Sequence, residues 1–124
     1  MTDRELMEAA AVAAGLHVLD WVPSSCCFVI ESEPGSSFRW NPLTDDGDAF
    51  RLAVKLGLRV EQDWFGGGQL RRMDGRARVL TTYSLELVGT YDVRPTWFKE
   101  DFNGDPCAAT RRAIVYAAAS MTGA

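Results

Sequence analysis

The chain contains few side chains of the types that act as nucleophiles, bases or soft metal ligands. It has one histidine and three cysteines, namely His17, Cys26, Cys27 and Cys107. We expect residues 22–25 to form a hairpin turn that places Trp21 opposite Cys26. Cys26 is then about 13 Å from His17 along the strands, which is beyond hydrogen-bond reach, so a Cys–His catalytic pair is not expected. A zinc site is not expected either, because the cysteines lack C-x-x-C spacing.

Three aspartates near the middle of the chain, Asp45, Asp46 and Asp48, are a second candidate for chemistry. Carboxylates at this spacing could bind a divalent cation and support a metal-dependent enzyme. The same residues also fit the first turn of a helix, where the helix dipole and the free backbone amides favour acidic side chains. We favour the helix start, because it explains the spacing without a ligand. The sequence therefore predicts no catalytic residue, no metal ligand and no cofactor.

A cluster of arginines is more informative. The Asp-Gly dipeptide at 74–75 is typical of a two-residue hairpin turn, and such a turn would pair Arg71 with Arg78. It would also pair Met73 with Arg76. Arg71, Arg76 and Arg78 would then share one face of the sheet, which is destabilising unless negative charge lies beside them.

The negative charge that this arginine face needs could come from outside or from inside the molecule. An external source would be a small anionic ligand or the acidic surface of a partner protein. An internal source would be Glu61 and Asp63, because alternation in the strand expected over 58–64 puts both on its polar face. Our register places Asp63 opposite Arg71 and Glu61 opposite Met73. The sequence leaves both sources open.

Aromatic side chains gather just before the last expected helix, at Trp97, Phe98 and Phe102. Charged residues lie among them, so we expect a polar loop over 96–102. Aromatic side chains in such a loop could anchor a partner protein or a second copy of the chain. They could also fold back and cover the end of a small core.

Caps and periodicity predict the elements that position these residues. Helices are expected from a cap at Thr2 to Gly15, from a cap at Asp45 or Thr44 to Gly57, and after Asp105-Pro106. Strands are expected over residues 16–21, 26–31 and 58–64, with more strand sequence between 76 and 91. The result is an α+β fold in which an antiparallel sheet of about four or five strands is covered by three helices. An α/β/α sandwich is one arrangement that fits this pattern.

Length and composition limit the classes of protein. A chain of 124 residues that is 47% hydrophobic suits one globular domain over residues 1–124. The net charge of −4 does not favour nucleic-acid binding. No apolar run approaches the roughly 20 residues of a membrane span. Three cysteines are an odd number for a disulfide framework, so we expect a reducing, cytoplasmic location.

Two segments carry a family resemblance. They are WNPLTDDGDAFRLAVKLG over residues 40–57 and DPCAATRRAIVYAAA over residues 105–119. With the helix expected over 3–14, they resemble the helical segments of small uncharacterised bacteriophage and prophage proteins of the ABA-sandwich type. The resemblance implies a phage-encoded accessory protein in the host cytoplasm, and it carries over no catalytic residue.

The leading hypothesis from the sequence is a non-enzymatic phage accessory protein that binds a host protein, including one of a defence system. Its candidate binding residues are those of the arginine face and the aromatic segment: Arg71, Arg76, Arg78, Trp97, Phe98 and Phe102. One alternative is a sponge that sequesters an anionic nucleotide. A further alternative is the metal-dependent enzyme that would use Asp45, Asp46 and Asp48. A homodimer is compatible with each of these functions.

Overall fold

The computed structural model describes residues 1–65, 74–81 and 97–122, and in these residues the expected α+β class is confirmed. The helices are α1 (Asp3–Ala13), α2 (Asp46–Leu56) and α4 (Pro106–Ser120). The strands are β1 (His17–Val22), β2 (Cys27–Glu33), β3 (Ser36–Trp40), β4 (Arg59–Trp64), β5 (Gly75–Leu80) and β6 (Trp97–Asp101). The prediction of one sheet with four or five strands is wrong for this part of the chain. The strands form two three-stranded antiparallel sheets, in the orders β1-β2-β3 and β4-β5-β6.

Each described helix begins at the side-chain cap that the sequence predicts. The Thr2 hydroxyl accepts a hydrogen bond from the Glu5 amide at 3.1 Å, and the Glu5 carboxylate accepts one from the Thr2 amide at 3.2 Å. Asp45 accepts from the Asp48 amide at 2.8 Å, and Asp105 accepts from the Ala108 amide at 3.0 Å. These bonds satisfy amides that have no partner within the helix, so local sequence is sufficient to fix where each helix starts.

Helices α1 and α2 end in the same way, and a three-stranded meander follows each of them. The glycines after the two helices, Gly15 and Gly57, have left-handed backbones with φ of +69° and +63°. The amide of the leucine that follows each glycine then bonds back to the helix, at 2.9 Å in both cases. This left-handed turn ends the helix, and a strand begins two residues after the glycine in both cases.

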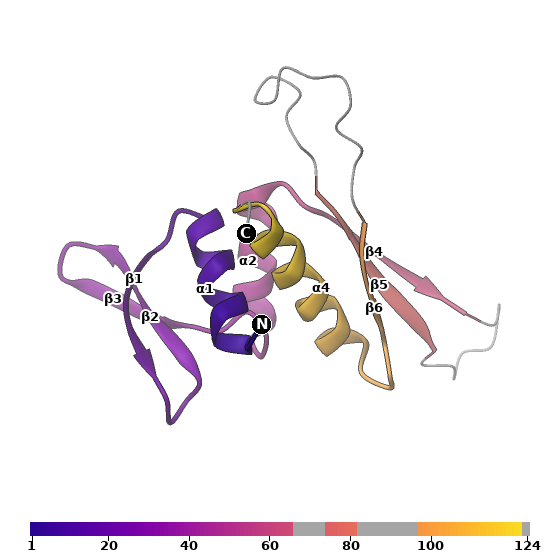
Figure 1. Ribbon diagram of the computed structural model, residues 1–124, viewed down its shortest axis with the longest axis horizontal. Helices are drawn as coiled ribbons and strands as arrows, with labels where there is room; N and C mark the ends of the chain where they lie inside the picture. The colour runs from indigo at the N-terminus through magenta and orange to yellow at the C-terminus, as the bar shows by residue number, and fades with distance from the viewer. Residues whose placement is uncertain (66–73, 82–96, 123–124) are drawn as a thin grey trace, which may run out of the picture.

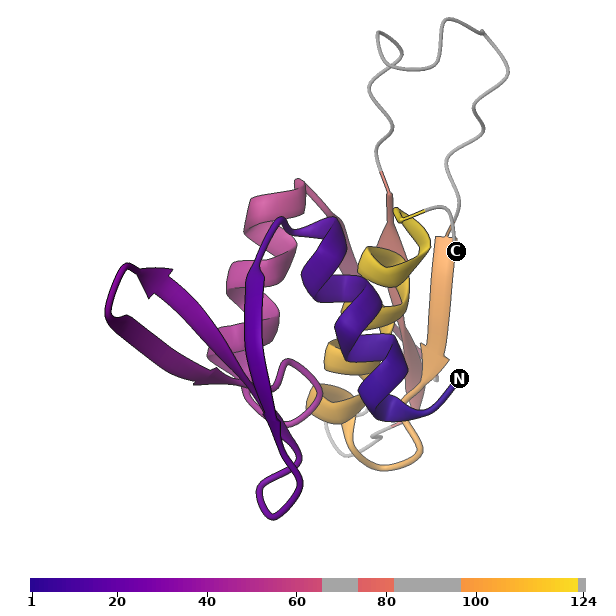
Figure 2. The same ribbon diagram turned by 60° about the vertical axis from the view of Figure 1, so that its left-hand side comes forward.

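The helices lie between the two sheets instead of covering the outside of one sheet (Figure 1). Helix α4 is central: α1 and α2 pack on one side of it, and β5 and β6 pack on the other. The sheet of β1, β2 and β3 lies beyond α1 and α2, as the turned view in Figure 2 also shows. The contact faces of the helices are rich in small side chains, which permit close approach, and the buried alanines are Ala10, Ala11, Ala14, Ala109, Ala113, Ala117, Ala118 and Ala119.

The first hairpin turn lies one residue later than the sequence predicts. Trp21 pairs with Phe28 and not with Cys26, and Val22 pairs with Cys27. The turn therefore spans residues 23–26 and contains Cys26, whose φ is +51°. The type of turn sets the register, and no local signal distinguishes a turn over 22–25 from one over 23–26.

The expected two-residue turn at 74–75 is also wrong. Gly75 lies within β5, opposite Trp64 of β4, and Arg76 pairs with Asp63 on one side and Asp101 on the other. Arg76 therefore cannot pair with Met73. The glycine is needed because a Cβ at position 75 would lie 2.2 Å from the Asp63 carbonyl oxygen and 2.7 Å from the Phe102 ring. A close approach between strands, and not a turn, explains this residue.

Candidate functional site

The described part of the predicted arginine face lies on the outer surface of the β4-β5-β6 sheet, on the side away from α4. Arg78 donates a hydrogen bond to Glu61 at 2.7 Å, and Arg76 donates one to Asp63 at 3.3 Å. The Nε atom of Arg78 is also 3.3 Å from an Asp63 oxygen, an ion pair whose geometry does not form a hydrogen bond. Arg71 lies outside the described residues. The internal acids thus neutralise Arg76 and Arg78, although the strand register differs from the expected one.

The same face holds opposite charges in near balance. Cross-strand pairing and alternation place on it four cations and three acids among the described residues: Arg59, Arg76, Arg78, Lys99, Glu61, Asp63 and Asp101. Arg59 donates to Glu61 at 2.8 Å, and the Arg78 guanidinium lies 4.4 Å from the centre of the Trp97 ring. The hydrogen bond from Arg78 is the main cause that lowers the pKa of Glu61, and the Arg59 charge adds to it. The described face therefore offers little free positive charge to an anionic ligand.

The aromatic segment forms strand β6 and not the expected loop. Trp97 and Phe98 are half-buried within this strand. Phe102 follows it directly, is 2% exposed, and packs edge-to-face on Trp64 with 4.7 Å between ring centres. The edge pairing with β5 buries these side chains, and pairing between distant strands is not visible in the local sequence. Phe102 thus covers one end of the core.

The three aspartates at the start of α2 each have a separate structural partner. Asp45 caps the helix. Asp48 is buried, accepts from the Asn41 amide at 2.9 Å, and pairs with Arg51 at 2.8 Å. Asp46 pairs with Arg111 at 2.6 Å. No cluster of three His, Cys, Asp or Glu side chains among residues 1–65, 74–81 and 97–122 could hold a metal ion.

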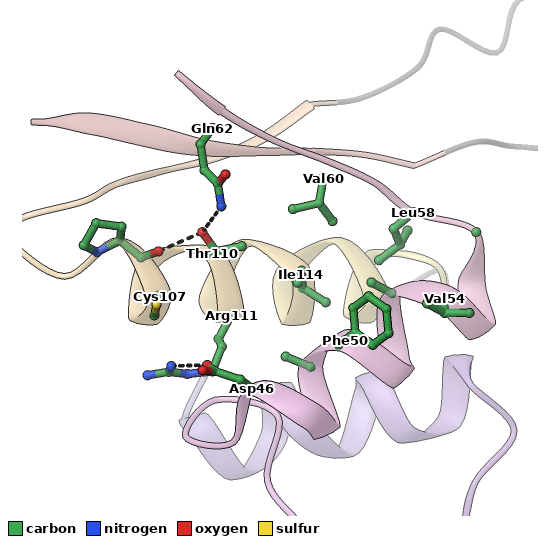
Figure 3. Close-up of a pocket in the computed structure, with 14 residues that line it drawn as sticks. Asp46, Phe50, Val54, Leu58, Val60, Gln62, Cys107, Thr110, Arg111 and Ile114 are labelled. Carbon is green, nitrogen blue, oxygen red and sulfur yellow. Dashed lines mark hydrogen bonds and ion pairs between the residues drawn. The ribbon is translucent and has the colours of Figure 1, made fainter. Parts of the chain in front are cut away.

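The sequence analysis missed an apolar groove between α2, β4 and α4, with a volume of about 450 Å³ (Figure 3). Phe50 of α2, Val60 of β4 and Ile114 of α4 point into it from its three sides. Val54 and Leu58 extend its apolar lining toward the end of α2. A volume of this size lies within the range of ordinary binding sites.

Large apolar side chains at the groove are open to solvent. Phe50 is 68% exposed and Val54 is 63% exposed, although both lie on a helix whose other apolar residues pack against the core. They are four residues apart, so they stand on the same side of α2. The buried side of this helix consists of Ala49, Leu52 and Ala53. A signal was present in the sequence, because the apolar arc of this helix is wider than one buried stripe requires.

The polar side chains at the groove bond to one another. Arg111 donates to Asp46 at 2.6 Å and to the Leu43 carbonyl oxygen at 2.8 Å. Gln62 donates to the Thr110 hydroxyl at 3.3 Å, and this hydroxyl donates to the Pro106 carbonyl oxygen at 2.7 Å. The cation of the groove is therefore already paired, and the surface left for a ligand is mainly apolar.

Comparison with known protein families, curated proteins and solved structures found no match to this chain. None of the described helices is long and apolar enough to cross a lipid bilayer. The phage resemblance therefore stays a prediction from the segments over 40–57 and 105–119.

Proposed function

We propose that this protein is a non-enzymatic binding protein, a phage accessory protein of the host cytoplasm, that docks the apolar surface of another protein in the groove between α2, β4 and α4. The observation that carries the proposal is the exposure of Phe50 and Val54 beside a ready-formed apolar groove. Clustered, exposed apolar side chains cost solvation free energy in a monomer, and such patches are typical of protein interaction sites.

The choice of the groove over the arginine face follows from the charges. Arg76 and Arg78 have carboxylate partners within 3.3 Å, so an anionic partner would have to displace them. Among residues 1–65, 74–81 and 97–122, no side chain covers Phe50 and Val54, which are 68% and 63% exposed. Burial of aromatic and aliphatic side chains in a central pocket supplies most of the affinity of many protein interfaces.

The choice of a protein over an anionic nucleotide follows from the lining. A nucleotide phosphate needs unpaired cations or free amides, whereas Arg111 is paired with Asp46. The groove instead suits aliphatic or aromatic side chains presented by a folded partner or a peptide. The host protein expected from the sequence is one such partner.

The chain offers a matched pair of variants for the test. Val54 near the end of α2 and Val12 near the end of α1 are 63% and 64% exposed, and both helices have 11 residues. Val54→Asp places a charge in the groove, and Val12→Asp places the same charge on an exposed helix position that does not line it. Both substitutions should have similar, small effects on folding.

The experiment has two steps. The immobilised protein first captures candidates from host lysate, and each candidate is then purified and titrated against the wild type and both variants. We expect Val54→Asp to weaken binding by at least about tenfold, the effect of about 1.4 kcal/mol at one interface side chain. Val12→Asp should bind as the wild type does. Equal binding of all three proteins, or a monomeric wild type that no protein binds, would refute docking in the groove.

A further inference from the structure

Strand β4 lies at the edge of its sheet, directly beside the groove. In the part of the chain that the structure describes, β4 pairs with β5 alone. The Phe65 amide donates to the Asp74 carbonyl oxygen at 2.9 Å, which shows that the odd-numbered residues of β4 direct their backbone groups toward β5. Antiparallel ladders alternate, so the backbone groups of Val60, Gln62 and Trp64 point away from β5. These groups can accept another strand.

We propose that the partner in the groove is a second copy of this chain, which pairs its β4 antiparallel to β4 about a two-fold axis at Glu61. This inference rests on the proposed function, because it names the occupant of the same groove. The pairing joins two three-stranded sheets into one continuous sheet of six strands. Two-fold dimers with self-complementary surfaces are the most common protein oligomers.

The charges on the outer face of β4 select this register. In an antiparallel pair, residues that face each other lie on the same side of the sheet. The two-fold axis must therefore lie between one residue and the same residue of the second copy, and that residue defines the register. An axis at Glu61 places Arg59 opposite Asp63 of the second copy, and the symmetry repeats this attractive pair. An axis at Gln62 would place Glu61 opposite Asp63 twice, and like charges directly opposite each other are destabilising.

An axis at Val60 is disfavoured by the chain path. That register would bring Asp63 and Trp64 of the second copy opposite Gly57 and Leu56, which are the cap and last residue of α2 rather than strand residues. With the axis at Glu61, the two Glu61 side chains face each other. Each is already held by its own Arg78 at 2.7 Å and Arg59 at 2.8 Å, so their mutual repulsion is reduced.

The groove side of the pairing is apolar. The same register sets Leu58 opposite Trp64 of the second copy and Val60 opposite Gln62. Trp64 is 53% exposed, and Leu58 lines the groove beside Val54. The second copy therefore contributes an indole ring to the open end of each groove.

The axis is perpendicular to the sheet, so the helices of both copies lie on the same side of the six-stranded sheet. The two grooves then face each other below the β4 strands, and Phe50 and Val54 approach the groove of the second copy. All the large exposed apolar side chains that flank the groove thus turn toward one interface. In the described part of the monomer, Phe50 and Val54 stay 68% and 63% exposed, and exposed apolar patches of this kind are typical of interfaces.

Sedimentation velocity over a range of protein concentrations tests the dimer. We expect the wild type and Val12→Asp to sediment as dimers, whereas Val54→Asp sediments as a monomer at the same concentrations. A monomeric wild type overturns the inference. A dimer that persists in Val54→Asp also overturns it, because that dimer does not use the groove.

Cysteine cross-linking tests the register. In a background with Cys26→Ser and Cys107→Ser, which removes the two exposed thiols, single substitutions Val60→Cys, Glu61→Cys and Gln62→Cys are oxidised separately. Only Glu61→Cys should give a covalent dimer, because facing residues at a non-hydrogen-bonded position are about 4.5 Å apart, within disulfide range. Cross-linking at Val60 or Gln62 instead, or at no position, overturns the inference.

The outcomes separate this inference from the proposed function. A monomeric wild type that binds a purified host protein, with loss of binding in Val54→Asp alone, leaves the docking groove intact and overturns only the second copy as its occupant. A monomeric wild type that binds no protein refutes both.

Discussion

Replacement of Gly75 by alanine should destabilise the protein strongly. The added Cβ would lie 2.2 Å from the Asp63 carbonyl oxygen and 2.7 Å from a carbon of the Phe102 ring. The first contact is with backbone, so β4 itself has to move away from β5. That movement strains the packing of Phe102 and weakens the hydrogen bond between Phe65 and Asp74, which is 2.9 Å long.

The expected loss has two parts. Overpacking a well-packed site costs about 1–3 kcal/mol, and a weakened backbone hydrogen bond costs about 1 kcal/mol. A total near 3 kcal/mol corresponds to a decrease in melting temperature of roughly 10 °C for a chain of this size. Elsewhere in a strand, alanine in place of glycine usually has a small or favourable effect, so the sign of the change is diagnostic.

Urea unfolding followed by tryptophan fluorescence measures this loss. Gly47→Ala is the control, because its Cβ would be 3.2 Å from the ends of the Arg51 side chain and the Asp45 carboxylate, which can shift. We expect the control to change the free energy of unfolding by less than about 1 kcal/mol. If Gly75→Ala unfolds within about 0.5 kcal/mol of the wild type, the strands do not approach each other as closely as described, and the reasoning is refuted.

Three further substitutions test the packing and charges of the described fold. Glu61→Gln should lower the free energy of unfolding at neutral pH, because the pKa of Glu61 is lowered in the folded state, mainly by the hydrogen bond from Arg78. This advantage of the wild type is complete above the ordinary glutamate pKa and is lost as the pH falls through the lowered pKa. The difference in free energy of unfolding between the wild type and Glu61→Gln, measured with urea, should therefore be larger at about pH 7 than at about pH 2.5. Arg78→Met should cost about 1 kcal/mol in urea unfolding, since its ion pairs are half-exposed, and should leave the binding of a host protein in the groove unchanged. If a folded Arg78→Met variant no longer binds the host protein, the arginine face and not the groove is the docking surface. Ala117→Leu should cost about 1–3 kcal/mol in thermal unfolding because Ala117 is fully buried, whereas Tyr116→Leu at the exposed neighbouring position should change little.

The predictions that succeeded rest on local contacts. The capping box of Thr2 and Glu5, and the cap at Asp45, involve residues three apart in the chain. Their hydrogen bonds form within one turn of helix, so the local sequence is enough to specify them. Alternation within β4 is also local, so the sequence placed Glu61 and Asp63 on one face and offered them as one of two sources of negative charge for the arginine face. The structure shows that Glu61 pairs with Arg78.

Two of the predictions that failed involve residues that are far apart in the chain. The Asp-Gly dipeptide at 74–75 has a strong local preference for a turn. Gly75 instead lies in a strand, where the Phe102 ring, at the end of β6, leaves no room for a Cβ. The segment with Trp97 and Phe98 has the polar composition of a loop, and pairing with β5 makes it a strand. Tertiary pairing outweighs the local preferences of such short segments.

The amino-acid sequence by itself determined where the described helices start, where α1 and α2 end, and that strands form near β1, β2 and β4; it did not predict β3 (Ser36–Trp40). It offered Glu61 and Asp63 as one of two sources of negative charge for the arginines. Only the tertiary structure decided that the strands divide into two sheets around the helices, that Arg76 and Arg78 meet Glu61 and Asp63, and that Phe50 and Val54 stand at the surface beside β4. The physical reason is the range of the interactions. Caps and alternation act over a few residues, whereas the groove exists because α4, which is distant in sequence from α2 and β4, meets them at one edge without filling it.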